Sequence, residues 1–182
     1  MVLKNIEEKI SIPKGVEIEI NKSIIKIKGP KGENQRKLFC PKIKLSKTHE
    51  HIIIEAKKTT KKEKKIVNTF KSHIKNLING VTDKFNYKIK ICSGHFPINA
   101  SIENNYIVLK NFFGEKKPRR AKILEGVDAK INGDTITLEG IDKEKVGQSA
   151  SNIEQCTRRC KFDRRIYQDG CWIIEKDGKK VR

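Results

Sequence analysis

Three pairs of adjacent arginines in the second half of this chain have the chemistry of a phosphate-binding site. The pairs are Arg119 and Arg120, Arg158 and Arg159, and Arg164 and Arg165, with Lys116, Lys117 and Lys161 close beside them. A planar guanidinium binds phosphate through two parallel hydrogen bonds and stacks on nucleobases, whereas a lysine supplies only a point charge. The first half of the chain has a single arginine, Arg36. We therefore predict that the second half makes the specific contacts to a nucleic acid.

The alternative interpretation is that these pairs are ordinary solvated residues of a loop and a helix end. Arg158 and Arg159 would also favour the C-terminus of a helix, where the helix dipole is negative. Three pairs in one strongly basic chain favour contact with an anion over simple solvation.

A run of lysines forms a second candidate binding segment, in the first half. Residues 57–65 contain six lysines, including Lys57, Lys58, Lys61 and Lys62. Such a run is typical of a nuclear-import signal, of a loop that contacts nucleic acid, or of a mobile connection, and these interpretations are compatible with one another. We expect it to add electrostatic attraction, while the arginines add specificity.

The charge of the whole chain supports a polyanionic partner. The formal net charge is +19 for 182 residues, with +12 in residues 1–82 and +7 in residues 83–182. Such an excess repels itself in the folded state, and nucleic acid is the commonest polyanion that neutralises it. A lysine-rich solvated surface is the alternative. Because 36% of the residues are hydrophobic and the charge is spread throughout, we expect a folded protein.

No motif for catalysis, for a metal or for a cofactor stands out. Cys92 and His95 are near in sequence, but an intervening glycine leaves them without a defined dyad geometry. The five cysteines include no C-x-x-C pair, which argues against structural zinc. We expect no enzyme, no cofactor, no small-molecule substrate and no membrane partner. The N-terminal residues lack an apolar signal core, so we expect an intracellular location.

A repeated motif indicates that the chain contains one small domain twice. Residues 24–33 read IIKIKGPKGE and residues 106–115 read YIVLKNFFGE, with lysine, glycine and glutamate in register at a spacing of 82. Further similarities in the same order make the repeat too long for a solenoid unit. We predict two tandem domains, residues 1–82 and residues 83–182, with the second as the main RNA binder.

Hydrophobic periodicity predicts an α+β fold, in which each domain has an antiparallel sheet packed against one main helix. Strands are expected at 16–20, 24–28, 43–45 and 51–55, and again at 98–102, 106–110, 127–131 and 135–139. Residues 85–91 alternate strictly and are expected to link or join the two domains. The GPKG and NFFG segments are expected to be hairpin turns, with Phe112 and Phe113 either as core anchors or as an exposed contact.

Capping signals predict where the two helices begin. Thr60 and Glu63 have the spacing of a capping box, and Gly80 is the expected end of the first helix. Asp142 is the expected N-cap of the second helix, whose buried stripe would run from Val146 to Cys160.

Several ordered motifs resemble one family of ribosomal proteins. They are VNTFKSHIKNLINGVT (67–82), FNYKIK (85–90), HFPIN (95–99) and NFFGEK (111–116), together with IP near the start, KGPKG, LEG before the second helix, and a DG turn followed by EK near the end. Over nearly the whole chain, this series is similar to the large-subunit ribosomal proteins of the universal L-six family, in its eukaryotic and archaeal form, eukaryotic L-nine. The chain departs from the usual pattern at Cys171 and Trp172 and in the segment before the first helix.

The resemblance implies two α+β domains that arose by duplication, without catalytic activity. It implies that the second domain binds large-subunit ribosomal RNA near the sarcin-ricin region and the base of the stalk, beside neighbouring ribosomal proteins and the site where translation factors dock. It also implies a cytoplasmic location in the large subunit, with nuclear and nucleolar transit during assembly. Two alternatives are a free RNA-binding module outside the ribosome and an enzyme that uses Cys92.

Overall fold

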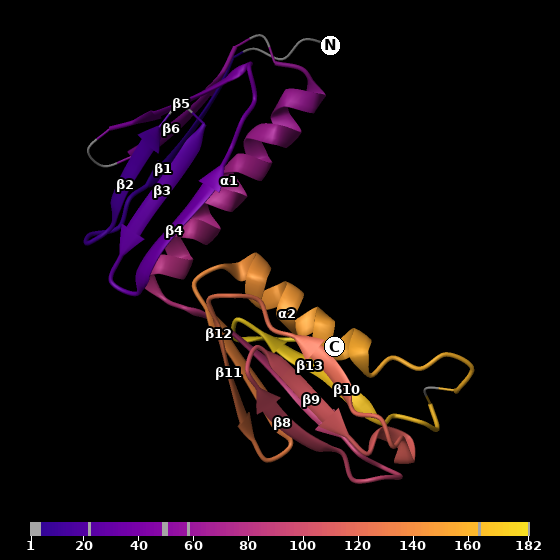
Figure 1. The fold of residues 1–182 in the computed structure, drawn as a ribbon. Helices are drawn as coiled ribbons and strands as arrows, with labels where there is room; N and C mark the ends of the chain where they lie inside the picture. The colour runs from indigo at the N-terminus through magenta and orange to yellow at the C-terminus, as the bar shows by residue number, and fades with distance from the viewer. Residues whose placement is uncertain (1–4, 22, 49–50, 58, 164, 182) are drawn as a thin grey trace. The chain divides into compact units, whose positions relative to one another are not determined.

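Two units that repeat the same order of elements make up the chain (Figure 1). The computed structural model describes residues 5–21, 23–48, 51–57, 59–163 and 165–181. The N-terminal unit comprises residues 1–84 and the C-terminal unit residues 85–182. The boundary predicted from the repeat lies two residues earlier, at the end of the first helix.

The N-terminal unit has two three-stranded antiparallel sheets and one helix. Its elements are β1 (Ile6–Ser11), β2 (Glu17–Asn21), β3 (Ile24–Gly29), β4 (Gly32–Lys37), β5 (Ile43–Lys47), β6 (His51–Ala56) and α1 (Lys61–Thr82). The sheets have the strand orders β1-β6-β5 and β2-β3-β4, and α1 packs against both. Alternation predicted β2, β3, β5 and β6. It missed β1 and β4. The sequence of β4, GENQRK, is polar, and the strand forms because the GPKG turn, confirmed as a hairpin, brings it back along β3.

Helix α1 begins where the sequence predicted and ends later. The Thr60–Glu63 capping box is present, with the Glu63 carboxylate accepting from the Thr60 backbone N–H at 2.8 Å. The predicted end at Gly80 is wrong, because Gly80 is a buried helical residue and the helix continues to Thr82. Its buried stripe runs from Val67 to Val81 and covers the apolar faces of the sheets.

The C-terminal unit repeats this plan and adds strands to it. Its elements are β7 (Phe85–Cys92), β8 (Asn99–Glu103), β9 (Tyr106–Lys110), the 3-10 helix η1 (Phe112–Gly114), β10 (Arg119–Lys122), β11 (Val127–Asn132), β12 (Thr135–Gly140), α2 (Lys143–Cys156), β13 (Gly170–Lys176) and β14 (Lys179–Lys180). The sheets have the orders β11-β12-β7-β13-β14 and β10-β9-β8. The first order repeats β5-β6-β1 and then continues with two further strands.

Strand β7 follows α1 in the chain and is the central strand of the larger sheet of the C-terminal unit, so it belongs to that unit. It pairs with β12 on one side and with β13 on the other, and its apolar residues Phe85, Tyr87, Ile89 and Ile91 are buried. Val146, Ala150 and Ile153 of α2 pack into the same core.

The NFFG segment is a 3-10 turn and not a tight hairpin turn, since Asn111 and Phe113 both have positive φ.

The predicted α+β class and tandem duplication are confirmed, although each unit has two sheets where one was expected. No helix in the described part of the chain is long and apolar enough to cross a membrane.

Candidate nucleic-acid interface

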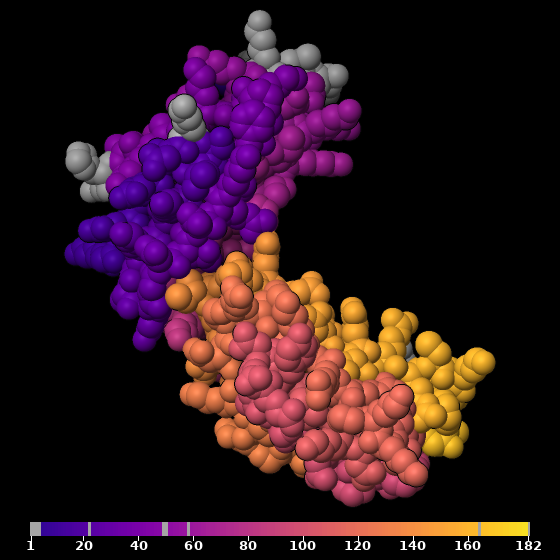
Figure 2. Space-filling model, viewed as in Figure 1, coloured from indigo at the N-terminus to yellow at the C-terminus, as the bar shows by residue number. Residues whose placement is uncertain are grey.

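The candidate site centres on the segment between α2 and β13, residues 157–169, which we call the arginine loop. Helix α2 ends at Cys156, and the predicted stripe is buried at Val146, Ala150, Ile153 and Thr157 but not at Cys160, which is an exposed loop residue. Thr157 explains the early end, because its hydroxyl donates to the Glu154 carbonyl and accepts from the Cys171 N–H, each at 3.0 Å. These bonds turn the chain away from the helix axis. In Figure 2 the segment lies at the surface, in the orange to yellow part of the colour scale.

The arginine loop rests on a cluster of rings from three parts of the chain. We define this aromatic cluster as His95, Phe112, Phe113, Phe162 and Tyr167. Tyr167 lies 5.0 Å from the ring of His95 and 5.0 Å from that of Phe162, and Phe113 lies 5.9 Å from Phe162 between ring centroids. Packed rings of this kind hold a loop in one conformation at little entropic cost. The two loop rings therefore fix the backbone that carries the arginines.

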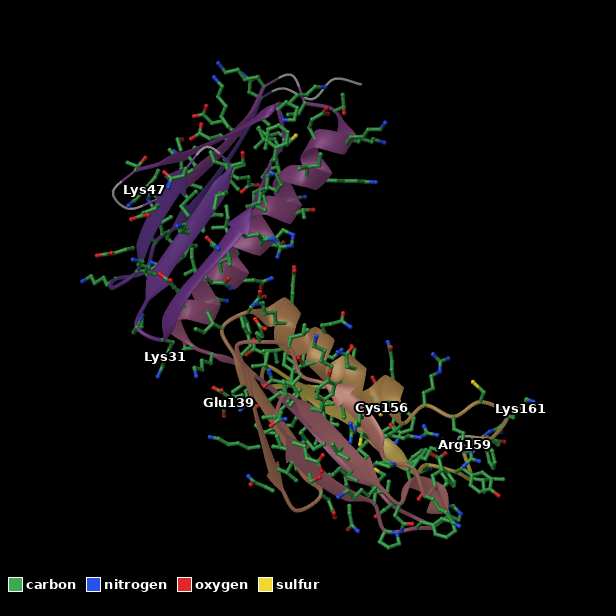
Figure 3. The ribbon with its side chains drawn as sticks, in the orientation of Figure 1. Lys31, Lys47, Glu139, Cys156, Arg159 and Lys161 are labelled. Carbon is green, nitrogen blue, oxygen red and sulfur yellow. The ribbon has the colours of Figure 1, made fainter. Side chains whose placement is uncertain are left out.

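Arg159 is built into this cluster. Its guanidinium carbon lies 4.3 Å from the ring centroid of Phe162 and 4.6 Å from that of Phe113, so the cation lies over both rings. Figure 3 shows Arg159 and Lys161 on the segment that follows Cys156. Arg159 is half-buried, while its neighbours Arg158 and Lys161 are exposed.

A buried carboxylate anchors the far end of the arginine loop. Asp169 accepts hydrogen bonds from the Gly94 N–H at 2.6 Å and the His95 N–H at 2.9 Å, and its other oxygen lies 2.6 Å from Nδ1 of the His95 ring. Burial opposes ionisation of this carboxyl, but the hydrogen bonds from His95 and Gly94 outweigh it and hold the pKa of Asp169 below its usual range. The loop is thus tied to the segment between β7 and β8.

Arg119 is occupied by contacts inside the unit. Its guanidinium donates to both carboxylate oxygens of Glu115, at 2.8 and 2.7 Å, and to the Cys156 carbonyl at 2.8 Å. It also lies 4.3 Å from the ring centroid of Phe112. The hydrogen bond from Arg119 lowers the pKa of Glu115 and raises that of Arg119. We therefore assign Arg119 a positioning role beneath the end of α2.

The remaining cations of the C-terminal unit lie on its surface. Arg120, Lys116 and Lys117 are exposed at and before β10, and Arg165 is 93% exposed beside Asp163, at 3.5 Å. Arg164 lies outside the described residues. Phe112 is a core anchor, whereas Phe113 is half-buried within the aromatic cluster and is neither a core anchor nor a fully exposed contact.

The lysine run belongs to the other unit and is largely helical. Lys61 and Lys62 are exposed in the first turn of α1, followed by exposed Lys64 and Lys65. Lys57 is exposed before the helix, and Lys58 lies outside the described residues. Four lysines at a helix N-terminus add to the positive end of the helix dipole.

Glu63, the acidic residue of that first turn, is already engaged inside the unit. Its carboxylate accepts from Lys42 Nζ at 2.8 Å and from Thr60, and these hydrogen bonds lower the pKa of Glu63 to about 2. Because the carboxylate is mostly buried, it does not lie among the exposed lysines of the helix end.

Sequence reasoning missed a pocket beside the arginine loop. The pocket has a volume of about 320 Å³ and is lined by Phe113, Glu154, Gln155, Thr157, Arg158, Arg159, Phe162, Tyr167, Asp169 and Trp172. Its walls come from α2, η1, the loop and β13, which are distant in sequence. The signal that could have indicated it is the closeness of Phe162, Tyr167 and Trp172 to two arginine pairs.

Two of the five cysteines, Cys156 and Cys171, lie where burial disfavours a reactive thiolate. All five are free thiols. Burial raises the pKa of Cys171 to about 12 and also raises the pKa of Cys156, which disfavours their thiolates. Among the described residues, no group of three or more His, Cys, Asp or Glu side chains is placed to hold a metal ion.

Comparison with known proteins matches both halves of the chain to one family model. The model described as ribosomal protein L6 matches residues 12–84 and again residues 96–170. The large ribosomal subunit protein uL6 of Methanosarcina mazei is 43% identical over 175 residues, which cover 96% of this chain and 99% of that protein. The corresponding protein of Methanobrevibacter smithii is 40% identical over 177 residues, covering 97% and 99%, and that of Methanococcus vannielii is 41% identical over 174 residues, covering 96% of each chain.

Proposed function

Because this chain belongs to the ribosomal protein L6 family, we propose that it is a structural constituent of the large ribosomal subunit and binds ribosomal RNA chiefly through its C-terminal unit. Membership in this family of structural proteins also confirms the expectation that it is not an enzyme. Its partners are ribosomal RNA and adjacent ribosomal proteins, and its place is on the ribosome in the cytoplasm.

The arginine loop is the observation that carries the RNA-binding proposal. Exposed Arg158, Lys161 and Arg165 project from a segment that is held by packed rings at its middle and by Asp169 at its end. A preorganised cationic loop loses little conformational entropy when it meets a phosphate backbone. Its guanidiniums suit the bidentate recognition of phosphate better than the lysines of α1 do.

We propose further that the protein lies near the sarcin-ricin region and the base of the stalk. There the protein would support the site where translation factors dock. The family resemblance motivates this position, and the fixed loop suits a supporting role in folded RNA. The archaeal relatives give no support to transit through a nucleus.

Binding to a large-subunit RNA fragment at several salt concentrations tests the proposal. If about eight cations contact phosphates, the log-log slope of the affinity against salt should be about −6 to −7. Gln substitution of Arg158, Arg159, Arg164 and Arg165 should weaken binding and incorporation into subunits more than Gln substitution of Lys61, Lys62, Lys64 and Lys65.

Two results would count against the proposal. A slope near zero would exclude electrostatic RNA binding, and equal losses from the two quadruple variants would exclude the division of labour between the units. Sedimentation of native cell extract separates the remaining alternative, since a free RNA-binding module would sediment away from ribosomes.

A further inference from the structure

The pocket beside the arginine loop is lined by aromatic rings and by charged groups. Phe113, Phe162, Tyr167 and Trp172 supply the rings, and Glu154 and Arg158 supply one carboxylate and one exposed guanidinium. Its volume of about 320 Å³ is at the lower end of the range for small-molecule sites, and a single nucleotide is a ligand of that class.

Two charged groups of this pocket have unused binding capacity. Within the described part of the chain, the side chains of Glu154 and Arg158 make no hydrogen bond or ion pair. The other carboxylate, Asp169, is occupied by Gly94 and His95, and Arg159 is stacked between two rings. The pocket thus offers one free acceptor and one free cation beside apolar ring surfaces.

We propose that this pocket binds one unstacked guanine nucleotide of the RNA, an assignment that rests on the proposed function. The base stacks on the aromatic wall, as splayed bases of single-stranded RNA do on protein rings. The Glu154 carboxylate accepts hydrogen bonds from the adjacent N1–H and N2–H groups of guanine. Arg158 binds the phosphate of the same nucleotide.

The carboxylate is what selects guanine over adenine and uracil. Adenine presents an acceptor at N1, which a carboxylate repels, and uracil presents a single N–H donor on its Watson–Crick edge. Guanine presents two parallel donors that match the two oxygens of one carboxylate. A phosphate ion would use only the cation and would not fill the space beside the rings.

Fluorescence of Trp172 tests the proposal directly, because it is the only tryptophan of the chain and lies in the pocket wall. The full-length protein is titrated with GMP, with AMP and with inorganic phosphate. We expect a saturable change with GMP, binding of AMP weaker by about tenfold, and no change with phosphate. Glu154→Gln should remove the preference for GMP, and Glu125→Gln, at an exposed loop position of the same unit, should keep it.

The outcomes separate this inference from the proposed function. Equal affinities for GMP and AMP, a response to phosphate alone, or no saturable response would overturn the guanine assignment. If the RNA fragment still binds with a steep salt dependence in that case, the proposed function stands and only the pocket assignment fails. Thermal denaturation of Glu154→Gln checks that the variant is folded, and a loss of preference in a fully folded variant supports the assignment.

Discussion

Arg119 and Glu115 form a two-bonded ion pair, with Nε to Oε2 at 2.8 Å and Nη2 to Oε1 at 2.7 Å. The third arm of the guanidinium donates to the Cys156 carbonyl, and its face covers Phe112. One side chain therefore joins the segment before β10, the end of α2 and the turn after β9. Its neighbour Arg120 points to the opposite face of β10 and is exposed, because successive side chains of a strand alternate.

The first prediction separates these two adjacent arginines. Arg119→Gln should lower the free energy of unfolding by about 1–2 kcal/mol, since it removes charge-assisted hydrogen bonds and a cation–π contact. Arg120→Gln should stay within about 0.5 kcal/mol of the original protein and should instead weaken RNA binding. Urea denaturation and RNA titration measure the two effects. Equal destabilisation by both substitutions would contradict the positioning role of Arg119.

The second prediction concerns the rings that hold the arginine loop. Phe162→Ala removes one face of the Arg159 stack and one partner of Tyr167, so the loop should open more often. Trypsin should then cleave after Lys161 about two- to fivefold faster, which corresponds to the loss of one cation–π contact. Phe39→Ala, at a 70% exposed position of the other unit, is the matched control and should leave that cleavage unchanged. An unchanged rate in Phe162→Ala would show that the rings do not restrain the loop.

The third prediction is a pH dependence at Asp169. Its ordinary pKa is 3.8, and the value in the folded protein is lower. Its contribution to stability is therefore complete above about pH 4 and is lost as the pH falls below 3.8 through the folded-state pKa. Asp169→Asn should cost about 2 kcal/mol at neutral pH, and the difference from the original protein should shrink in acid.

Thermal denaturation between neutral and acidic pH measures this difference. The control is Asp163→Asn, at an exposed position in the same loop, for which we expect only a small change in stability. A gap between the original protein and Asp169→Asn that stays constant with pH would show that the ionised carboxylate is not what holds the loop.

Local signals predicted the elements that depend on local chemistry, and tertiary pairing created the rest. The Thr60–Glu63 spacing located the start of α1 because a capping box is formed within four consecutive residues. Strand β4 is polar and forms only because it pairs with β3, so its own pattern gives no strand signal. The end of α2 depends on Thr157 binding Cys171, which is fourteen residues away.

The candidate site shows the same division between local and tertiary signals. Composition predicts that the arginines face an anion, and their number in the second half predicts that the site lies there. It could not separate Arg119 from Arg120, because the difference lies in which face of β10 each side chain occupies. It also could not indicate the pocket, whose walls come together only when η1, α2 and β13 pack.

The last prediction uses two glycines of the C-terminal unit with opposite surroundings. A Cβ at Gly140 would lie 2.7 Å from Cγ2 of Val146 and 3.1 Å from the Gly126 carbonyl, so Gly140→Ala must shift the Val146 side chain or the backbone around it and should cost about 1–3 kcal/mol. A Cβ at Gly147, within α2, would meet only Tyr87 at 3.8 Å, an ordinary contact. Gly147→Ala should therefore stabilise the unit by about 0.5–1 kcal/mol, because alanine loses less backbone entropy in a helix. Chemical denaturation of both variants checks the signs, and destabilisation by Gly147→Ala would mean that α2 packs more tightly on β7 than this geometry indicates.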